Sequence, residues 1–167
     1  MHAAAEKSFL ENLNQNIGIV HRVCNAYFRR DAAEREDVFQ EIMYQLWKSY
    51  PNFAGESKFS TWMYKVALNT AITHIRRRTR TPRNAALTEP LTPGPNISEH
   101  MSRVEEVHLL HEAIASLTDI DKAIILLHLE DQNYDEIATI TGLTTTNVSV
   151  RLVRIKRALK EYLQGNQ

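Results

Sequence analysis

The chain has 167 residues, enough for one domain or two small ones, and its 43% hydrophobic and 24% charged residues are typical of a folded globular protein. Its formal net charge is zero, so any binding to nucleic acid must come from a local cationic patch and not from bulk charge. The single cysteine, Cys24, excludes an internal disulfide and a cysteine-based zinc site, and the lack of a long apolar run predicts a cytoplasmic protein without membrane insertion.

Two stretches near the N-terminus show helical apolar spacing. Residues 6–30 repeat apolar side chains at intervals of three and four, which predicts an amphipathic helix that can break near Gly18. Asp31 begins a short polar connection, Asp37 opens a second helix, and Pro51 ends it. The second helix has an apolar stripe of Val38, Ile42, Met43, Leu46, Trp47 and Tyr50. Its other side carries Asp37, Gln40, Glu41, Gln45 and Lys48, which by themselves indicate only a solvated face.

The residues from Lys58 to Arg80 form a basic stretch without any acidic side chain, preceded by the glycine-containing loop of residues 52–57. As a helix, this stretch would bury one side, formed by Tyr64, Ala67, Leu68, Ala71 and Ile75. Another side offers Trp62, Lys65, Asn69, Thr73 and Arg76. Cations contact phosphates, aromatic rings stack on unpaired bases and amides read base edges, so this side suits a nucleic-acid strand. An arginine run at a helix end also complements the helix dipole, and that plainer interpretation stays open.

Residues 81–99 hold four of the five prolines and show no helical pattern. We therefore predict a flexible, Pro-rich linker over residues 81–100. It separates an N-terminal domain of residues 6–80 from a C-terminal domain of residues 101–164. The five glycines and the scarcity of alternating β-branched residues predict an all-α protein of two small helical domains.

The C-terminal part predicts four helices. Apolar spacing indicates one helix from about Met101 to Leu117, another capped by Thr118 or Asp119, and a short one over residues 134–141. Gly142 follows, and a last helix begins after Thr144 or Thr145 and runs to about residue 163. A short helix, a tight turn with glycine and a longer helix are typical of a helix-turn-helix, whose second helix enters the major groove of DNA. Its side opposite the apolar stripe offers Thr146, Asn147, Ser149, Arg151, Arg154 and Lys156.

These residues resemble a known family in both halves of the chain. The segment DVFQEIMYQLWKSYPNFAGESKFSTWMYKVALNTAITHIRRR is similar to region 2 of the extracytoplasmic-function (ECF) sigma factors of bacterial RNA polymerase. The segment YDEIATITGLTTTNVSVRLVRIKRALKEYL resembles their region 4. The resemblance implies a sigma factor that binds core polymerase, recognises the −10 and −35 promoter elements and helps to open the duplex.

The resemblance also implies site residues. It places polymerase binding, to the clamp helices of the largest subunit, on Asp37, Gln40 and Glu41, with the polymerase flap as a further contact. It places −10 recognition on Lys58, Trp62, Lys65, Asn69, Thr73, Arg76 and Arg77. It places −35 recognition on Thr146, Asn147, Ser149, Arg151 and Arg154. The expected partners are core polymerase and promoter DNA, and many relatives also have an anti-sigma factor. Thr73 departs from the common family pattern among the −10 contacts. Residues 144–146 also depart from it, so the −35 sequence preference of relatives is not carried over.

Two other functions compete with this interpretation. A helix-turn-helix regulator would act on duplex DNA without being a polymerase subunit, but the aromatic and basic helix argues against it. A nucleic-acid-processing enzyme could use His108 and His111, whose spacing suits a metal, but no carboxylate or cysteine set accompanies them. No nucleotide-binding glycine loop is present either. We therefore expect no enzymatic activity, no metal and no cofactor.

Overall fold

The computed structural model describes residues 2–80 and 100–166, and these residues form helices without any β-strand. The all-α prediction is confirmed for this part of the chain. The chain divides into two compact units, Met1–Asn84 and Ala85–Gln167. The predicted Pro-rich linker lies almost wholly outside the described residues.

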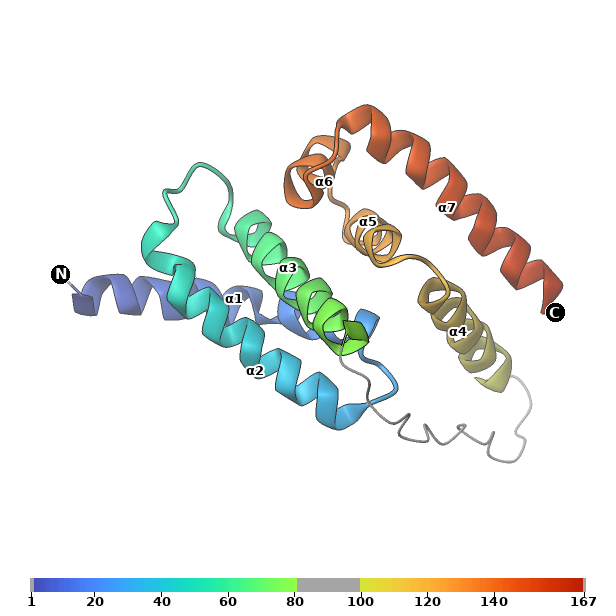
Figure 1. The fold of residues 1–167 in the computed structure, drawn as a ribbon, viewed down its shortest axis with the longest axis horizontal. Helices are drawn as coiled ribbons and strands as arrows, with labels where there is room; N and C mark the ends of the chain where they lie inside the picture. Colours follow the sequence, from blue (N-terminus) through green and yellow to red (C-terminus); the bar gives the residue numbers. More distant parts are fainter. Residues whose placement is uncertain (1, 81–99, 167) are drawn as a thin grey trace. The chain divides into compact units, whose positions relative to one another are not determined.

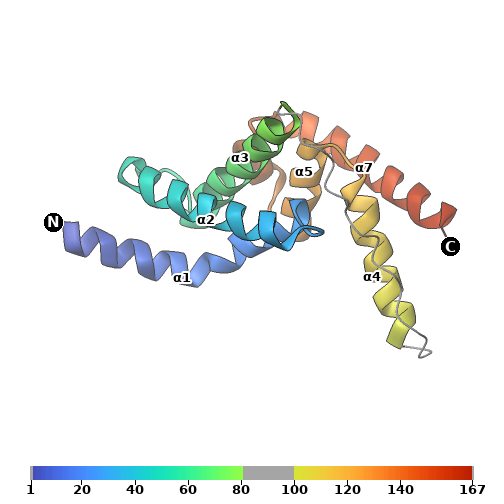
Figure 2. The same ribbon diagram turned by 60° about the horizontal axis from the view of Figure 1, so that its bottom comes forward.

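The N-terminal unit is a bundle of three helices (Figures 1 and 2). They are α1 (His2–Tyr27), α2 (Ala32–Ser49) and α3 (Phe59–Arg80), with the short 3₁₀ segment η1 (Tyr50–Asn52) after α2. Each helix contributes its apolar stripe to one core, in which the largest fully buried side chains are Phe9, Val20, Val23, Val38, Ile42, Leu46 and Met63. Burial of such side chains, at roughly 1.5–3 kcal/mol each, is what holds three polar-faced helices together.

A break that the sequence allows in this unit does not occur, and one predicted helix start is wrong. Helix α1 continues through Gly18 without a break, because the packing of its apolar stripe outweighs the roughly 1 kcal/mol that an interior glycine costs. Helix α2 begins at Ala32 and not at Asp37. Its N-cap is Asp31, whose side chain accepts a hydrogen bond from the backbone N–H of Glu34 at 2.9 Å.

The C-terminal unit consists of α4 (His100–Ala115), α5 (Asp119–Leu129), α6 (Tyr134–Thr141) and α7 (Thr145–Gly165). Its core is formed by Ala113, Ala123, Ile124, Leu127, Ile137, Val148, Leu152 and Ile155. The predicted apolar stripe of α4 is only partly buried. Val104 and Val107 are 63% and 51% exposed, whereas Ala113, near the C-terminal end of α4, is buried.

Candidate nucleic-acid interface

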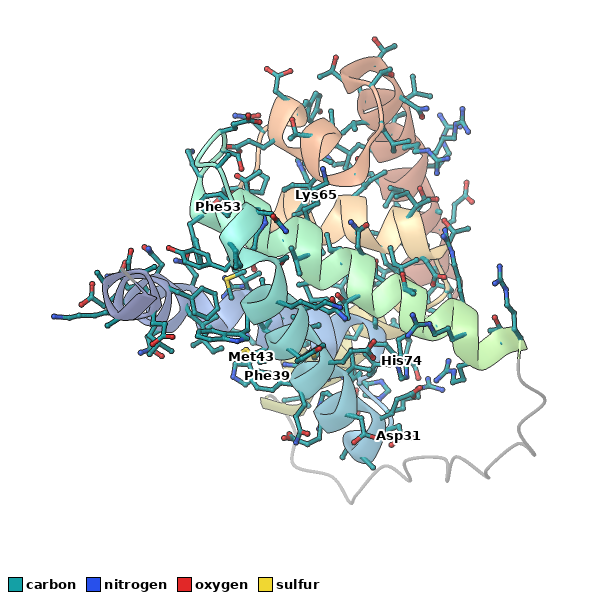
Figure 3. All side chains as sticks on the ribbon, turned by 60° about the vertical axis from the view of Figure 1, so that its left-hand side comes forward. Asp31, Phe39, Met43, Phe53, Lys65 and His74 are labelled. Carbon is teal, nitrogen blue, oxygen red and sulfur yellow. The ribbon has the colours of Figure 1, made fainter. Side chains whose placement is uncertain are left out.

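Helix α3 has the two faces that its sequence predicts. Tyr64, Ala67, Leu68 and Ala71 are buried against α1 and α2, whereas Ile75 is half-buried. The opposite side exposes Lys65, Asn69, Thr73 and Arg76 in one row at intervals of three and four. Figure 3 shows Lys65 and His74 on opposite sides of this helix, with His74 on the side toward α2. The exposed row therefore presents two cations, an amide and a hydroxyl along one side of a helix.

The loop between η1 and α3 rests on an aromatic cluster that includes Trp62. The ring of Trp62 lies 5.1 Å from Phe53, 5.3 Å from Phe59 and 6.2 Å from Tyr50 between ring centroids. Gly55, at the tip of the loop, has φ +72°, a conformation that favours glycine. Trp62 is half-buried, so it braces the loop and leaves only part of its ring for a ligand. Lys58, at the end of the loop, is exposed.

The cationic end of α3 is tied to α2 by an acidic side chain that sequence reasoning missed. Glu34 accepts a hydrogen bond from Arg78 at 2.6 Å, and its second oxygen lies 3.2 Å from Nε2 of His74. The side chain of Glu34 is only 10% exposed, whereas that of Arg78 is 42% exposed. One arginine of the basic run is therefore fixed to the bundle. Arg76, by contrast, lies on the exposed side of α3.

The three candidate polymerase-binding residues occupy different surroundings. Asp37 and Gln40 are exposed on α2. Glu41 is half-buried and turned toward α3, where its oxygens lie 3.4 Å from Nδ1 of His74 and 3.6 Å from Arg77. Glu41 and Arg77, predicted for two different partners, are thus neighbours within the fold. A partner that binds Glu41 must share it with α3.

The start of α7 is shaped by local capping. Asn133 and Glu136 form a capping box at the start of α6. Gly142 then ends α6 with φ +74° and donates its N–H to the carbonyl of Ala138. Thr144 caps α7, and its hydroxyl accepts from the N–H of Asn147 at 3.1 Å. This is the helix, tight turn and helix that the sequence predicts, and Figure 1 shows the turn from α6 into α7.

The candidate −35 residues on α7 divide into two groups. Thr146, Asn147 and Arg154 are exposed, which is the condition for reaching a DNA groove. Ser149 and Arg151 are half-buried. Arg151 donates to Asp121 on α5 at 2.8 Å and, through Nε, to the side-chain oxygen of Asn147 at 3.2 Å. Arg151 therefore has partners inside the protein before any DNA is bound.

No group of three histidine, cysteine or acidic side chains suited to a metal ion occurs within residues 2–80 and 100–166. His108 is exposed and lies 3.9 Å from Glu112, one helical turn away. Cys24 is buried in the bundle. Among the described helices, none has both the length and the apolar character that crossing a bilayer requires.

Comparison with known families matches both units. Residues 13–81 match the model described as Sigma-70 region 2, and residues 108–159 match Sigma-70, region 4. The first of these runs from within α1 to the end of α3, and the second includes the turn between α6 and α7.

Similar proteins carry the same description. The chain is 31% identical over 148 residues to the RNA polymerase sigma-H factor of Pseudomonas aeruginosa, covering 82% of this chain and 77% of that protein. It is 30% identical over 140 residues to the ECF RNA polymerase sigma-E factor of Escherichia coli K12, covering 77% and 73%. A solved structure of the sigma factor RpoE with the anti-sigma factor NepR from Bartonella quintana shares the fold. Its TM-score is 0.70 at 18% identity, covering 96% of this chain and 99% of that one. The chain belongs to the ECF family of bacterial RNA polymerase sigma factors.

Proposed function

We propose that the two units divide promoter recognition between them. The N-terminal domain, residues 6–80, binds core polymerase and captures the −10 element, and the C-terminal domain, residues 101–164, reads the −35 element. Residues 81–100 connect them. The observation that carries this proposal is the exposed row on α3, where Lys65, Asn69, Thr73 and Arg76 stand opposite the side that packs on α1 and α2.

Capture of an opened strand requires contacts that duplex DNA cannot offer. Unpaired bases present their faces to aromatic rings and their edges to amides, and each stacked base contributes about 1–3 kcal/mol. The aromatic cluster below the loop, with Trp62 half-exposed, lies at the N-terminal end of the row on α3. Lys58, Lys65, Arg76 and Arg77 supply charge for the phosphates. In this arrangement Asn69 and Thr73 stand beside the strand where base edges pass.

Reading the −35 element needs only a helix in the major groove, because that duplex stays closed. The first turns of α7 enter the groove, as in other helix-turn-helix proteins. Thr146, Asn147 and Arg154 are exposed for base or phosphate contacts, and Ser149 lies at their edge. Arginine pairs with two acceptors of guanine, so Arg154 is our candidate for such a contact.

Docking on polymerase uses the exposed polar side of α2. Asp37 and Gln40 provide an acidic, hydrogen-bonding surface for the clamp helices, with Glu41 at its border toward α3. A contact between the C-terminal domain and the polymerase flap would hold that domain at the −35 element. Sigma factors are regulatory subunits, so we assign no catalytic residue, no metal and no cofactor.

Regulation by an anti-sigma factor fits the same family. The RpoE structure that shares this fold was solved with the anti-sigma factor NepR bound. We propose that a protein inhibitor of this kind also binds this chain and competes with polymerase for it. In this proposal the chain, its inhibitor and polymerase are all in the cytoplasm.

Strand capture can be tested with full-length protein assembled on core polymerase. A fluorescent adenine analogue in the non-template strand of an identified promoter brightens when the −10 element unstacks. We expect Asn69→Ala to slow or reduce this signal, while Asn25→Ala, an exposed asparagine on α1, leaves it unchanged. Equal opening by both variants would remove Asn69 from the −10 site.

A further inference from the structure

The outer side of α7 carries two exposed valines. One row along the helix, with intervals of four, three and four residues, is formed by Thr146, Val150, Val153 and Arg157, and all four are exposed. The buried stripe of the same helix has the same spacing two residues further along and consists of Val148, Leu152, Ile155 and Leu159. Two residues turn a helix by about 200°, so the exposed row lies almost directly opposite the core. We call Thr146, Val150, Val153 and Arg157 the outer row.

Valine is an unfavourable residue for a helix position that faces only water. Val150 and Val153 are 44% and 59% exposed. A β-branched side chain loses rotational freedom in a helix, so alanine or lysine would stabilise α7 more at these two positions. Single exposed apolar residues are common on protein surfaces. These two, however, are neighbours on the side of α7 that we propose to enter the groove, and an apolar contact with DNA would account for both.

Polar side chains border the two valines on both sides of the outer row. Asn147 and Arg154 lie on one side, and Ser149 and Lys156 lie on the other. In a major groove these flanks meet base edges and the phosphates of the two strands, whereas the row between them faces the base pairs. The first three residues of the outer row have short side chains, so the helix backbone can approach the bases closely.

The chemistry of the major groove decides which base a valine side chain can use. Adenine, guanine and cytosine present hydrogen-bonding groups there, and thymine adds the C5-methyl group. An apolar side chain that covers a donor or an acceptor removes its water without replacing the hydrogen bond, which is unfavourable. Contact with the methyl group removes apolar surface of both partners from water, which is favourable. A valine that faces the base pairs therefore favours thymine.

We propose that Val150 and Val153 are specificity-determining residues that contact the C5-methyl groups of thymines in the −35 element. The two valines are about 4.5 Å apart along the axis of α7, and successive base pairs are about 3.4 Å apart. The two thymines are therefore one or two base-pair steps apart, on either strand. The inference rests on the proposed −35 role of α7. It adds a base preference from side chains outside the set that the family resemblance implies.

Deoxyuridine isolates the methyl group, because it differs from thymidine only in lacking that group. Full-length protein with core polymerase first selects its preferred −35 element from a randomised promoter library. Each thymine of that element, on either strand, is then replaced singly by deoxyuridine, and binding of the holoenzyme to the promoter is measured. We expect binding to weaken about fourfold at each of two positions, since burial of one methyl group contributes about that factor.

Shortening each valine should remove this sensitivity at one position only. We expect the deoxyuridine effect to fall below about twofold at one position in Val150→Ala and at the other in Val153→Ala, because each pair of methyl-bearing groups forms a double-mutant cycle. Val104→Ala, at a 63% exposed valine of α4, is the matched control and should keep both effects. Alanine favours the helix at exposed positions, so both α7 variants should fold, which circular dichroism checks.

Three results would overturn the inference while leaving α7 as the −35 reader. They are a preferred −35 element without thymine, a holoenzyme that binds every deoxyuridine promoter as tightly as the thymine promoter, and deoxyuridine effects that persist unchanged in both valine variants. In the last case another side chain contacts the methyl groups. If wild-type holoenzyme shows no −35 preference at any position, the proposed role of α7 fails as well.

Discussion

Removal of the Glu34 carboxylate should loosen the N-terminal bundle at the cationic end of α3. Glu34 joins α2 to Arg78 at 2.6 Å and to His74 at 3.2 Å. A hydrogen bond to a charged group contributes about 1.5–3 kcal/mol, but an exposed ion pair contributes only about 0.2–1 kcal/mol. Because Glu34 is 10% exposed and Arg78 42% exposed, we expect Glu34→Ala to lower the free energy of unfolding by about 2 kcal/mol.

The two tryptophans make this change measurable in the full-length chain. Trp47 and Trp62 are the only tryptophans, and both belong to the N-terminal unit, so their fluorescence follows the unfolding of that unit. A loss of about 2 kcal/mol lowers its melting temperature by roughly 8–16 °C for a unit of this size. Glu34→Gln keeps one acceptor oxygen, so its free energy of unfolding should fall less than that of Glu34→Ala.

Glu36→Ala serves as the matched control. Glu36 is an exposed glutamate on the same helix, and its truncation should change stability by less than about 0.5 kcal/mol. If Glu34→Ala and Glu36→Ala melt together with the wild-type protein, the ion pairs between α2 and α3 do not stabilise the bundle. The reasoning on the fixed arginine would then be refuted.

Three further predictions follow from other parts of the structure. Asp37→Arg should weaken binding to core polymerase in a competition assay, because it reverses a charge on the exposed docking side of α2. Glu11→Arg, at an exposed position on α1, should bind core polymerase normally. Equal affinities of the two variants would count against the docking assignment. Gly142→Ala should lower the free energy of unfolding by about 1 kcal/mol, because φ at this position is +74°, even though an added Cβ would meet open space. Gly165→Ala should leave that free energy unchanged. Hydrogen exchange of α6 and α7 measures the difference, and unchanged protection in Gly142→Ala would contradict the prediction. Burial raises the pKa of Cys24 from 9.0 to about 11, so the folded state keeps the thiol neutral. That contribution to stability is complete below pH 9.0 and is lost, at about 1.4 kcal/mol per pH unit, as the pH rises toward 11. Urea unfolding should therefore show a steeper alkaline loss for wild type than for Cys24→Ala, and parallel curves would refute the assignment.

The sequence predicts what depends on near neighbours along the chain. The helix-turn-helix was foreseeable because its signals are local, with Gly142 at the end of one helix and Thr144 three residues before the N–H that it caps. The buried side of α3 was foreseeable because helical spacing alone places Tyr64, Ala67, Leu68 and Ala71 together. The start of α2 was not, since two aspartates, Asp31 and Asp37, precede its apolar stripe and only the folded geometry selects Asp31 as the cap.

Contacts between distant residues could not be predicted from one sequence. Glu34 and His74 are 40 residues apart, and Asp121 and Arg151 are 30 apart. No spacing rule connects them, because they meet only when two helices pack side by side. Periodicity also cannot show where a stripe meets solvent. It placed Trp47 with the apolar residues of α2, yet this side chain is 49% exposed. The roles of the individual promoter and polymerase residues remain predictions of the family resemblance.

Run-off transcription with purified core RNA polymerase tests the central claim most directly. Templates would be genomic fragments from the source organism, with and without this protein. We predict discrete start sites that appear only when the protein is added, each preceded by a shared pair of elements at −10 and −35. Absence of new start sites, together with a footprint on duplex DNA by the protein alone, would contradict the assignment as a sigma factor.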